Sequence, residues 1–164
     1  MSVYDFLPPL ILMEDHQNDW SKYLEAIYEY FCQDFVTSKP TLEGKRFALK
    51  RYPMINGKEA TFWHIISEGV IENERLPDLR RCERIRWPRA IIDAFNSHCD
   101  GVKYWRNFRK GEERVILALD DFSYIVVLAD RGEYMLLWTA YCIERKHSRN
   151  KLRREYEEYL NGKG

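Results

Sequence analysis

The chain has 164 residues, of which 45% are hydrophobic and 15% aromatic, and its formal net charge at pH 7 is zero. This composition can fill an ordinary core, so general disorder is excluded and one domain over residues 1–164 is expected. No apolar run approaches the roughly 18–20 residues that a membrane span needs, and the acidic N-terminus does not resemble a secretion signal. We therefore expect a cytoplasmic protein with no membrane partner.

The charge is unevenly distributed along the chain. Residues 1–36 carry seven acidic side chains and one lysine, a net charge of −6, whereas residues 75–114 carry eleven basic and six acidic side chains, a net charge of +5. This asymmetry indicates an anionic partner for the middle of the chain, or an acidic segment that folds over it. A solvated surface with ordinary charge scatter would give the same pattern.

The four cysteines lie far apart and form no C-x-x-C pair. This spacing favours reduced, buried thiols over a disulfide framework. A zinc site is poorly supported, because such sites use closely spaced ligand pairs. We expect no metal ion and no cofactor.

The acidic N-terminal segment, residues 1–45, is predicted to be helical. A helix over 18–36 begins at Asn18, a plausible N-cap, and its apolar residues recur at three- and four-residue steps. A short strand is expected at Phe47–Pro53, followed by a turn at Asn56-Gly57. The apolar run Thr61–Ser67 fits either a helix or a strand.

The middle of the chain predicts two short helices and then a run of strands. The first helix covers Pro77–Ile85, and Pro88 suits the first turn of a second helix that continues through Phe95. Short turn-like loops then separate four apolar runs, which favours an antiparallel meander. The fold class is therefore α+β: N-terminal helices packed on a four-stranded antiparallel meander, with a charged C-terminal helix over 144–162. The four runs are Val102–Phe108, Arg114–Leu119, Tyr124–Leu128 and Tyr134–Tyr141.

The last strand ends with two hydroxyl side chains, Thr139 and Tyr141. Residues two apart in a strand point to the same face, so both hydroxyls are expected at one place on the edge of a cleft. Strict alternation assigns them to the face of Met135 and Leu137, and assigns Trp138 to the opposite face. Because Thr and Tyr are also strong strand formers, a purely structural reason for their presence stays open.

A histidine and an arginine cluster supply the other groups of a candidate site. His64 lies in an apolar run, where it is either a core residue or a group that exchanges protons near neutral pH. Arginines can hold a phosphate with a bidentate fork or simply form a solvated basic face. Metal-free cleavage of RNA needs these groups alone, because the 2′-oxygen of RNA is the nucleophile. The candidate phosphate clamps are Arg81 and Arg84, and their neighbours Arg80 and Arg86 are predicted to bind RNA.

Aromatic and basic residues also alternate over 104–110. Trp105, Arg106 and Arg109 are predicted to bind RNA, because a single strand is held by stacking on aromatic rings and by phosphate contacts. A half-buried edge strand would have the same pattern.

Together these segments resemble phage-encoded members of the barnase–EndoU–colicin–RelE-like nuclease superfamily. The resemblance rests on Phe62-Trp63-His64, Asp78-Leu-Arg-Arg81-x-x-Arg84-Ile-x-Trp87, Tyr124-Ile-Val-Val-Leu128 and Thr139-Ala-Tyr141, and it defines a nuclease-like core over 61–141. It implies an α+β domain, metal-independent endoribonuclease activity and, for many members, a toxin.

Position by position, the resemblance implies that His64 is the acid–base group and that Arg81 or Arg84 clamps the phosphate. Thr139 and Tyr141 would orient or stabilise the scissile phosphate. The motif places no glutamate as a second base; Glu68 and Glu83 are the nearest in sequence to these groups.

The sequence thus predicts a cytoplasmic, phage- or prophage-type, toxin-like endoribonuclease that leaves a 2′,3′-cyclic phosphate. Its partner would be RNA, with an antitoxin or another protein as a further partner. One alternative is a non-catalytic RNA- or protein-binding module in which His64 is structural. A second alternative is a toxin-like inhibitor that acts through protein contacts.

Overall fold

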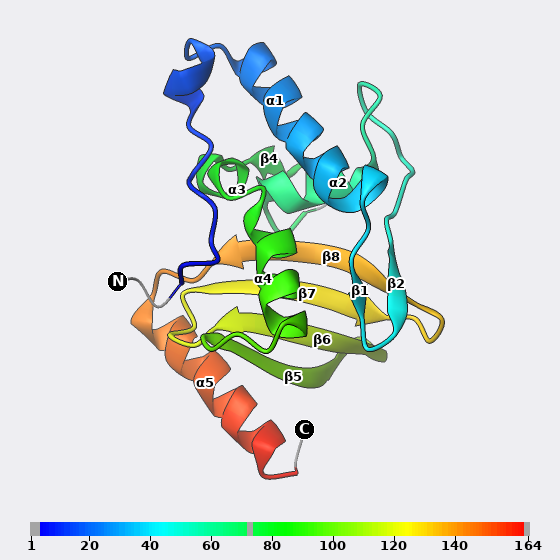
Figure 1. Ribbon diagram of the computed structural model, residues 1–164, viewed down its shortest axis with the longest axis vertical. Coiled ribbons are helices and arrows are strands. Elements are labelled where there is room, and N and C mark those ends of the chain that lie inside the picture. The colour runs from blue at the N-terminus through cyan, green and yellow to red at the C-terminus, as the bar shows by residue number, and fades with distance from the viewer. Residues whose placement is uncertain (1–3, 72–73, 163–164) are drawn as a thin grey trace.

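The computed structural model describes residues 4–71 and 74–162. Helices occupy mainly the first 96 residues, and four long strands and a final helix follow (Figure 1). In chain order the elements are η1 (Met13–His16), α1 (Trp20–Cys32), η2 (Gln33–Thr37), β1 (Thr41–Leu42), β2 (Lys45–Ala48), α2 (Ala60–Ile66), β3 (Ser67–Glu68), β4 (Leu76–Pro77), α3 (Leu79–Glu83), α4 (Trp87–Asn96), β5 (Val102–Arg109), β6 (Glu112–Leu119), β7 (Tyr124–Asp130), β8 (Tyr134–Cys142) and α5 (Lys146–Leu160).

The main sheet is larger than the sequence predicts. Strands β5 to β8 form the expected antiparallel meander, but the sheet has six strands in the order β1-β2-β8-β7-β6-β5. Strand β2 runs parallel to β8, from the pair Arg46–Tyr134 to the pair Ala48–Leu136. The four-stranded sheet is therefore a wrong prediction, and the observed sheet is mixed. Because this register ends at Leu136, the second half of β8 continues beyond β2.

The helices begin close to where the sequence places them. The N-cap of α1 is Asp19, not Asn18, and its side chain accepts a hydrogen bond from the backbone N–H of Lys22 at 3.2 Å. The ambiguous run at 61–67 is a helix, α2, and Pro88 lies in the first turn of α4 as predicted. None of the helices in the described ranges is long and apolar enough to cross a membrane.

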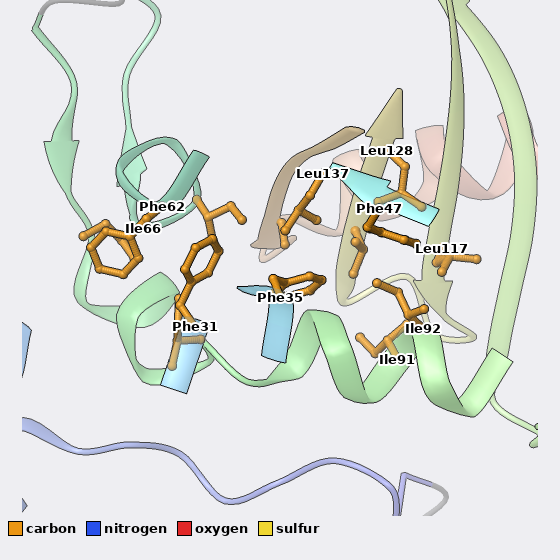
Figure 2. Close-up of a cluster of buried hydrophobic side chains, with 14 of the residues drawn as sticks. Phe31, Phe35, Phe47, Phe62, Ile66, Ile91, Ile92, Leu117, Leu128 and Leu137 are labelled. Atoms are coloured by element: carbon orange, nitrogen blue, oxygen red, sulfur yellow. The ribbon is translucent and has the colours of Figure 1, made fainter. Parts of the chain in front are cut away.

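The core lies on both faces of the sheet. The larger cluster packs α1, η2, α2 and α4 against one face. Figure 2 shows Phe35 near Leu137 and Phe47 of the strands, and the rings of Phe31 and Phe62 continue the cluster among the helices. On the other face, α5 covers a second cluster that includes Trp105 and Ile125. Strands β6 and β7 are therefore buried on both faces, which is why their sequences are nearly continuously apolar.

A β-bulge at Trp138 changes the alternation of β8. Val127 pairs with Thr139, but the next residue, Leu128, pairs with Leu137, so Trp138 is an extra residue in the strand. Before the bulge, Leu137 belongs to the core on the α1–α4 side, whereas Trp138 and Tyr141 pack in the cluster under α5. The prediction that Thr139 and Tyr141 share a face with Met135 and Leu137 is wrong for this reason.

Candidate functional site

The candidate site lies along the second half of β8. Helices α2 and α3 pack against this strand, and the short β3–β4 ladder connects them, pairing Ser67 with Pro77 and Glu68 with Leu76. A polar pocket of about 340 Å³ opens at this edge. Its lining residues come from β3, α3 and the end of β8: Glu68, Asp78, Arg80, Arg81, Tyr141, Cys142 and Glu144.

Arg81 contacts two other predicted site residues, Thr139 and Tyr141. Its Nη1 donates to the backbone carbonyl of Ser67 at 2.6 Å and lies 3.5 Å from Thr139 Oγ1. Its guanidinium carbon is 5.0 Å from the centroid of the Tyr141 ring, a cation–π contact. Asp78 caps α3 by accepting from the Arg81 N–H at 3.3 Å, which fixes the start of the helix that carries this arginine.

Arg81 is partly buried, and this burial lowers the pKa of its guanidinium. Burial first, and then the positive charge of Arg75, lower the pKa of Arg81, while Asp78, Glu68 and Tyr141 act in the opposite direction. Arginine stays protonated at neutral pH even so. A partly desolvated guanidinium interacts more strongly with an anion than one in bulk water, so Arg81 is suited to hold a phosphate.

His64 is half-buried on α2, and its ring contacts Trp138 of β8. Its Nδ1 is 3.0 Å from the carbonyl oxygen of Trp138, and the two rings are 5.1 Å apart. Because a carbonyl can only accept, Nδ1 must carry a proton. In the neutral imidazole the unprotonated nitrogen is then Nε2.

Arg75, which the sequence did not single out, connects His64 with Arg81. Its Nη2 donates to the carbonyl of His64 at 3.0 Å and also to that of Ser67, the carbonyl that Arg81 contacts. Its Nη1 donates to the carbonyl of Gly69 at 2.7 Å. Arg75 therefore holds the end of α2 and the start of β3 in place. No short motif predicts this, because the contacts use backbone carbonyls.

Glu68 is the second residue that the motifs do not place. It lies four residues after His64 in sequence, is exposed, and lines the polar pocket together with Arg81 and Tyr141. Its negative charge is close enough to raise the pKa of Arg81. The signal that could have found it is this short separation from the candidate histidine.

Arg84 and Arg80 do not belong to the Arg81 cluster, which consists of Arg81, Thr139 and Tyr141. Arg84 donates to the carbonyl of Arg80 at 3.1 Å, lies 3.7 Å from Glu83, and has its guanidinium 5.0 Å from the Trp87 ring. It does not line the polar pocket, so Arg81 is the better phosphate clamp of the two. Arg80 does line the pocket, where it is ion-paired with Glu144.

The predicted RNA-binding strand is largely structural. Trp105 is fully buried, and its Nε1 donates to Glu155 of α5 at 2.6 Å, so its ring is not accessible for stacking and that prediction is wrong. Arg106 is held by three carboxylates, those of Glu43, Glu113 and Asp130. Its charge is therefore already neutralised within the fold.

The last two predicted RNA-binding residues lie outside the polar pocket. Arg86 donates to both carboxylate oxygens of Asp34 and lies over the Tyr30 ring at 4.7 Å, which ties α4 to the end of α1. Arg109 is exposed at the end of β5, 3.9 Å from Glu155. Neither residue lies with the group around Arg81.

Within residues 4–71 and 74–162, no three His, Cys, Asp or Glu side chains are grouped so that they could hold a metal ion. No family model, curated protein or solved structure matches the chain.

Proposed function

We propose that the protein is a metal-independent endoribonuclease of the phage or prophage, toxin-like kind. The observation that supports this is the contact of Arg81 with Thr139 and Tyr141 beside one polar pocket, while His64 contacts the carbonyl of Trp138, the residue before Thr139. A guanidinium, two hydroxyls and an imidazole match the needs of a phosphodiester that is attacked by its own 2′-oxygen.

In the proposed reaction the 2′-oxygen of one nucleotide bonds to the neighbouring phosphorus, and the bond from phosphorus to the 5′-oxygen breaks. The products are a 2′,3′-cyclic phosphate and a free 5′-hydroxyl. Arg81 stabilises the charge on the pentacoordinate phosphorus, and the hydroxyls of Thr139 and Tyr141 donate hydrogen bonds to its oxygens. These interactions accelerate cleavage to the extent that they strengthen in the transition state.

Two proton transfers accompany this step. One group takes the proton of the 2′-hydroxyl, and another gives a proton to the departing 5′-oxygen. We assign the second task to Nε2 of His64 in its charged form and the first to the carboxylate of Glu68. An imidazolium can give a proton and a carboxylate can take one, so one step can use both groups.

The test is cleavage of a fluorescent RNA in EDTA, with detection of the cyclic phosphate. His64→Asn should lose at least about 100-fold in rate, the usual acid–base contribution. His98→Asn is the matched control, because His98 is exposed and asparagine tolerates its positive φ of 58°. An inactive wild-type protein that still binds RNA in a salt-dependent way would instead identify a binding module.

Arg81 and Glu68 are tested separately. Arg81→Lys keeps the charge but loses the planar fork, and should slow cleavage about 100- to 1,000-fold. Glu68→Gln should lose at least about 100-fold in rate, whereas Glu133→Gln, in the exposed β7–β8 turn, should leave the rate unchanged. An unaltered cleavage rate in Glu68→Gln would refute the role of this carboxylate.

A further inference from the structure

A second pocket, of about 550 Å³, is lined by His64 and by Ser67, the residue whose carbonyl accepts from Arg81. Its walls come from the segment before α2, from α2 itself and from the bulge of β8. Two tryptophans, Trp63 and Trp138, and the apolar side chains Pro53 and Ile55 are among the residues that line it. This volume and this mixture of aromatic and apolar walls are typical of a site for a small organic group.

Internal hydrogen bonds hold the walls of this pocket. The Trp63 indole donates to the carbonyl of Ile55 at 3.0 Å, and Ile55 and Lys58 form a small β-bridge around the Asn56-Gly57 turn. The Thr61 hydroxyl accepts from the backbone N–H of Lys50 at 2.7 Å and donates to its carbonyl at 3.2 Å. The pocket is therefore formed before a ligand arrives, which lowers the entropic cost of binding.

The charges around the pocket favour an anionic ligand. Lys50 and Arg75 contribute positive charge, and none of the described lining residues is acidic. The polar pocket differs, because three carboxylates stand there beside two arginines. A flat, apolar base fits the aromatic walls, and the positive charge of Lys50 and Arg75 favours the polyanionic chain that carries the base.

The rim adds apolar surface that the fold leaves uncovered. Tyr52, Met54 and Ile55 are 69%, 41% and 52% exposed, and they follow one another along the segment that forms one wall. A run of exposed large apolar side chains beside a pocket is typical of a ligand-contact surface. Bases of a single-stranded RNA bind such surfaces by stacking, with little dependence on sequence.

We propose that this pocket binds one nucleobase next to the scissile phosphate, stacked against Trp63 or Trp138. The inference rests on the proposed endoribonuclease function, because His64 lines the base pocket while the Ser67 carbonyl, also in its wall, accepts from Arg81. In this proposal the base lies in the second pocket and the phosphate that follows it is held by Arg81. The pocket would thus set which nucleotide is presented for cleavage.

The experiment observes the indole N–H signals of the five tryptophans by NMR, with the intact chain. The probes are AMP, GMP, CMP and UMP, each as the 5′-monophosphate, and ribose 5-phosphate as the probe without a base. We expect at least one nucleotide to shift the Trp63 and Trp138 signals and to bind at least five-fold more tightly than ribose 5-phosphate. Trp20, Trp87 and Trp105 should not shift.

Variants locate the binding. Trp63→Leu should weaken nucleotide binding roughly 5- to 100-fold, the range expected for loss of one base–aromatic stack. Trp20→Leu is the matched control, since Trp20 is 38% exposed at the start of α1 and should leave affinity unchanged. Trp63→Phe keeps a ring and should retain most of the affinity, even if the bond to Ile55 is lost.

The outcomes separate this inference from the proposed reaction. Equal binding of ribose 5-phosphate and the nucleotides, or no shift at Trp63 and Trp138 with any of them, would overturn the base pocket even if RNA is cut. Nucleotide binding at Trp63 in a protein that does not cut RNA would keep the pocket and refute the nuclease. Displacement of the signals by an apolar peptide but by no nucleotide would also overturn the inference.

Discussion

Replacing Asp130 with asparagine tests how one carboxylate ties the sheet together. Asp130, at the end of β7, accepts from Lys45 of β2 at 2.8 and 2.9 Å, from Arg106 of β5 at 2.9 Å, and from the backbone N–H of Gly132 at 2.9 Å. Its side chain is 7% exposed. The substitution keeps the shape of the side chain and removes its charge.

The size of the effect follows from the pKa of Asp130. Burial alone would raise this pKa, but the hydrogen bonds from Lys45, Gly132 and Arg106 outweigh burial and lower it from 3.8 to about 2. A difference of nearly two units corresponds to about 2 kcal/mol of folding free energy. Because the folded pKa is below the unfolded one, this stability is complete above about pH 5 and is lost as the pH falls towards 2.

The assay is urea denaturation of the wild-type protein and Asp130→Asn at several pH values between 7 and 2.5. The difference in unfolding free energy between the two proteins should shrink by about 2 kcal/mol over this range. Asp100→Asn, at an exposed position before β5, is the control and should show no such change. This prediction is refuted if the difference in unfolding free energy between the wild-type protein and Asp130→Asn stays constant to within about 0.5 kcal/mol, the usual scatter of such comparisons.

Three further predictions concern residues with structural roles. Burial raises the pKa of the Cys82 thiol to about 12, so alkylation of the folded protein at pH 8 should modify exposed Cys99 and spare Cys82 until the chain is denatured, as read by mass spectrometry. Trp105→Ala should lower the unfolding free energy by about 3–5 kcal/mol in urea melts, and RNA affinity of the folded protein should not change. Arg86→Ala leaves the carboxylate of Asp34, which is 6% exposed, without its arginine partner and should lower the unfolding free energy by about 3 kcal/mol. Adding Asp34→Asn should restore part of this loss. Equal stability of the single and double variants would contradict the prediction.

Local patterns were sufficient to predict most of the helices and the meander. Apolar residues at three- and four-residue steps identified α1, and Pro88 identified the start of α4. The extension of the sheet was not predictable in this way. Strands β1 and β2 are two and four residues long, and β2 pairs with β8, which lies almost 90 residues later in the chain. Such a short strand gains its order from a distant partner and not from its own sequence.

The misreading of β5 has a similar physical origin. Alternating aromatic and basic residues look alike whether a helix covers the aromatic face or water does. Here α5 covers it, so Trp105 is buried against Tyr156 while Arg106 meets carboxylates on the other face. The sequence shows that β5 has an aromatic face and a basic face, but the packing of α5 decides which of these side chains are accessible.

The candidate site itself was predicted in part. The pairing of Thr139 with Tyr141 follows from residue spacing alone, and Arg81 joins them because Asp78 caps the helix that carries it. The role of Arg75 could not be predicted from the sequence, because it donates to backbone carbonyls that no side-chain pattern reveals. The orientation of His64 depends on a carbonyl that the bulge exposes, and strict alternation does not contain a bulge.

The extra residue in β8 also offers a route by which such a protein can diversify. If the insertion moved two places towards the C-terminus, Thr139 would turn into the interior on the α1–α4 side while Tyr141 kept its place, with no change in amino-acid composition. Chemistry could therefore be gained or lost by a shift of backbone register, with few substitutions at the reactive positions. Descendants of one ancestor could share every reactive side chain and still differ in which of them faces the substrate.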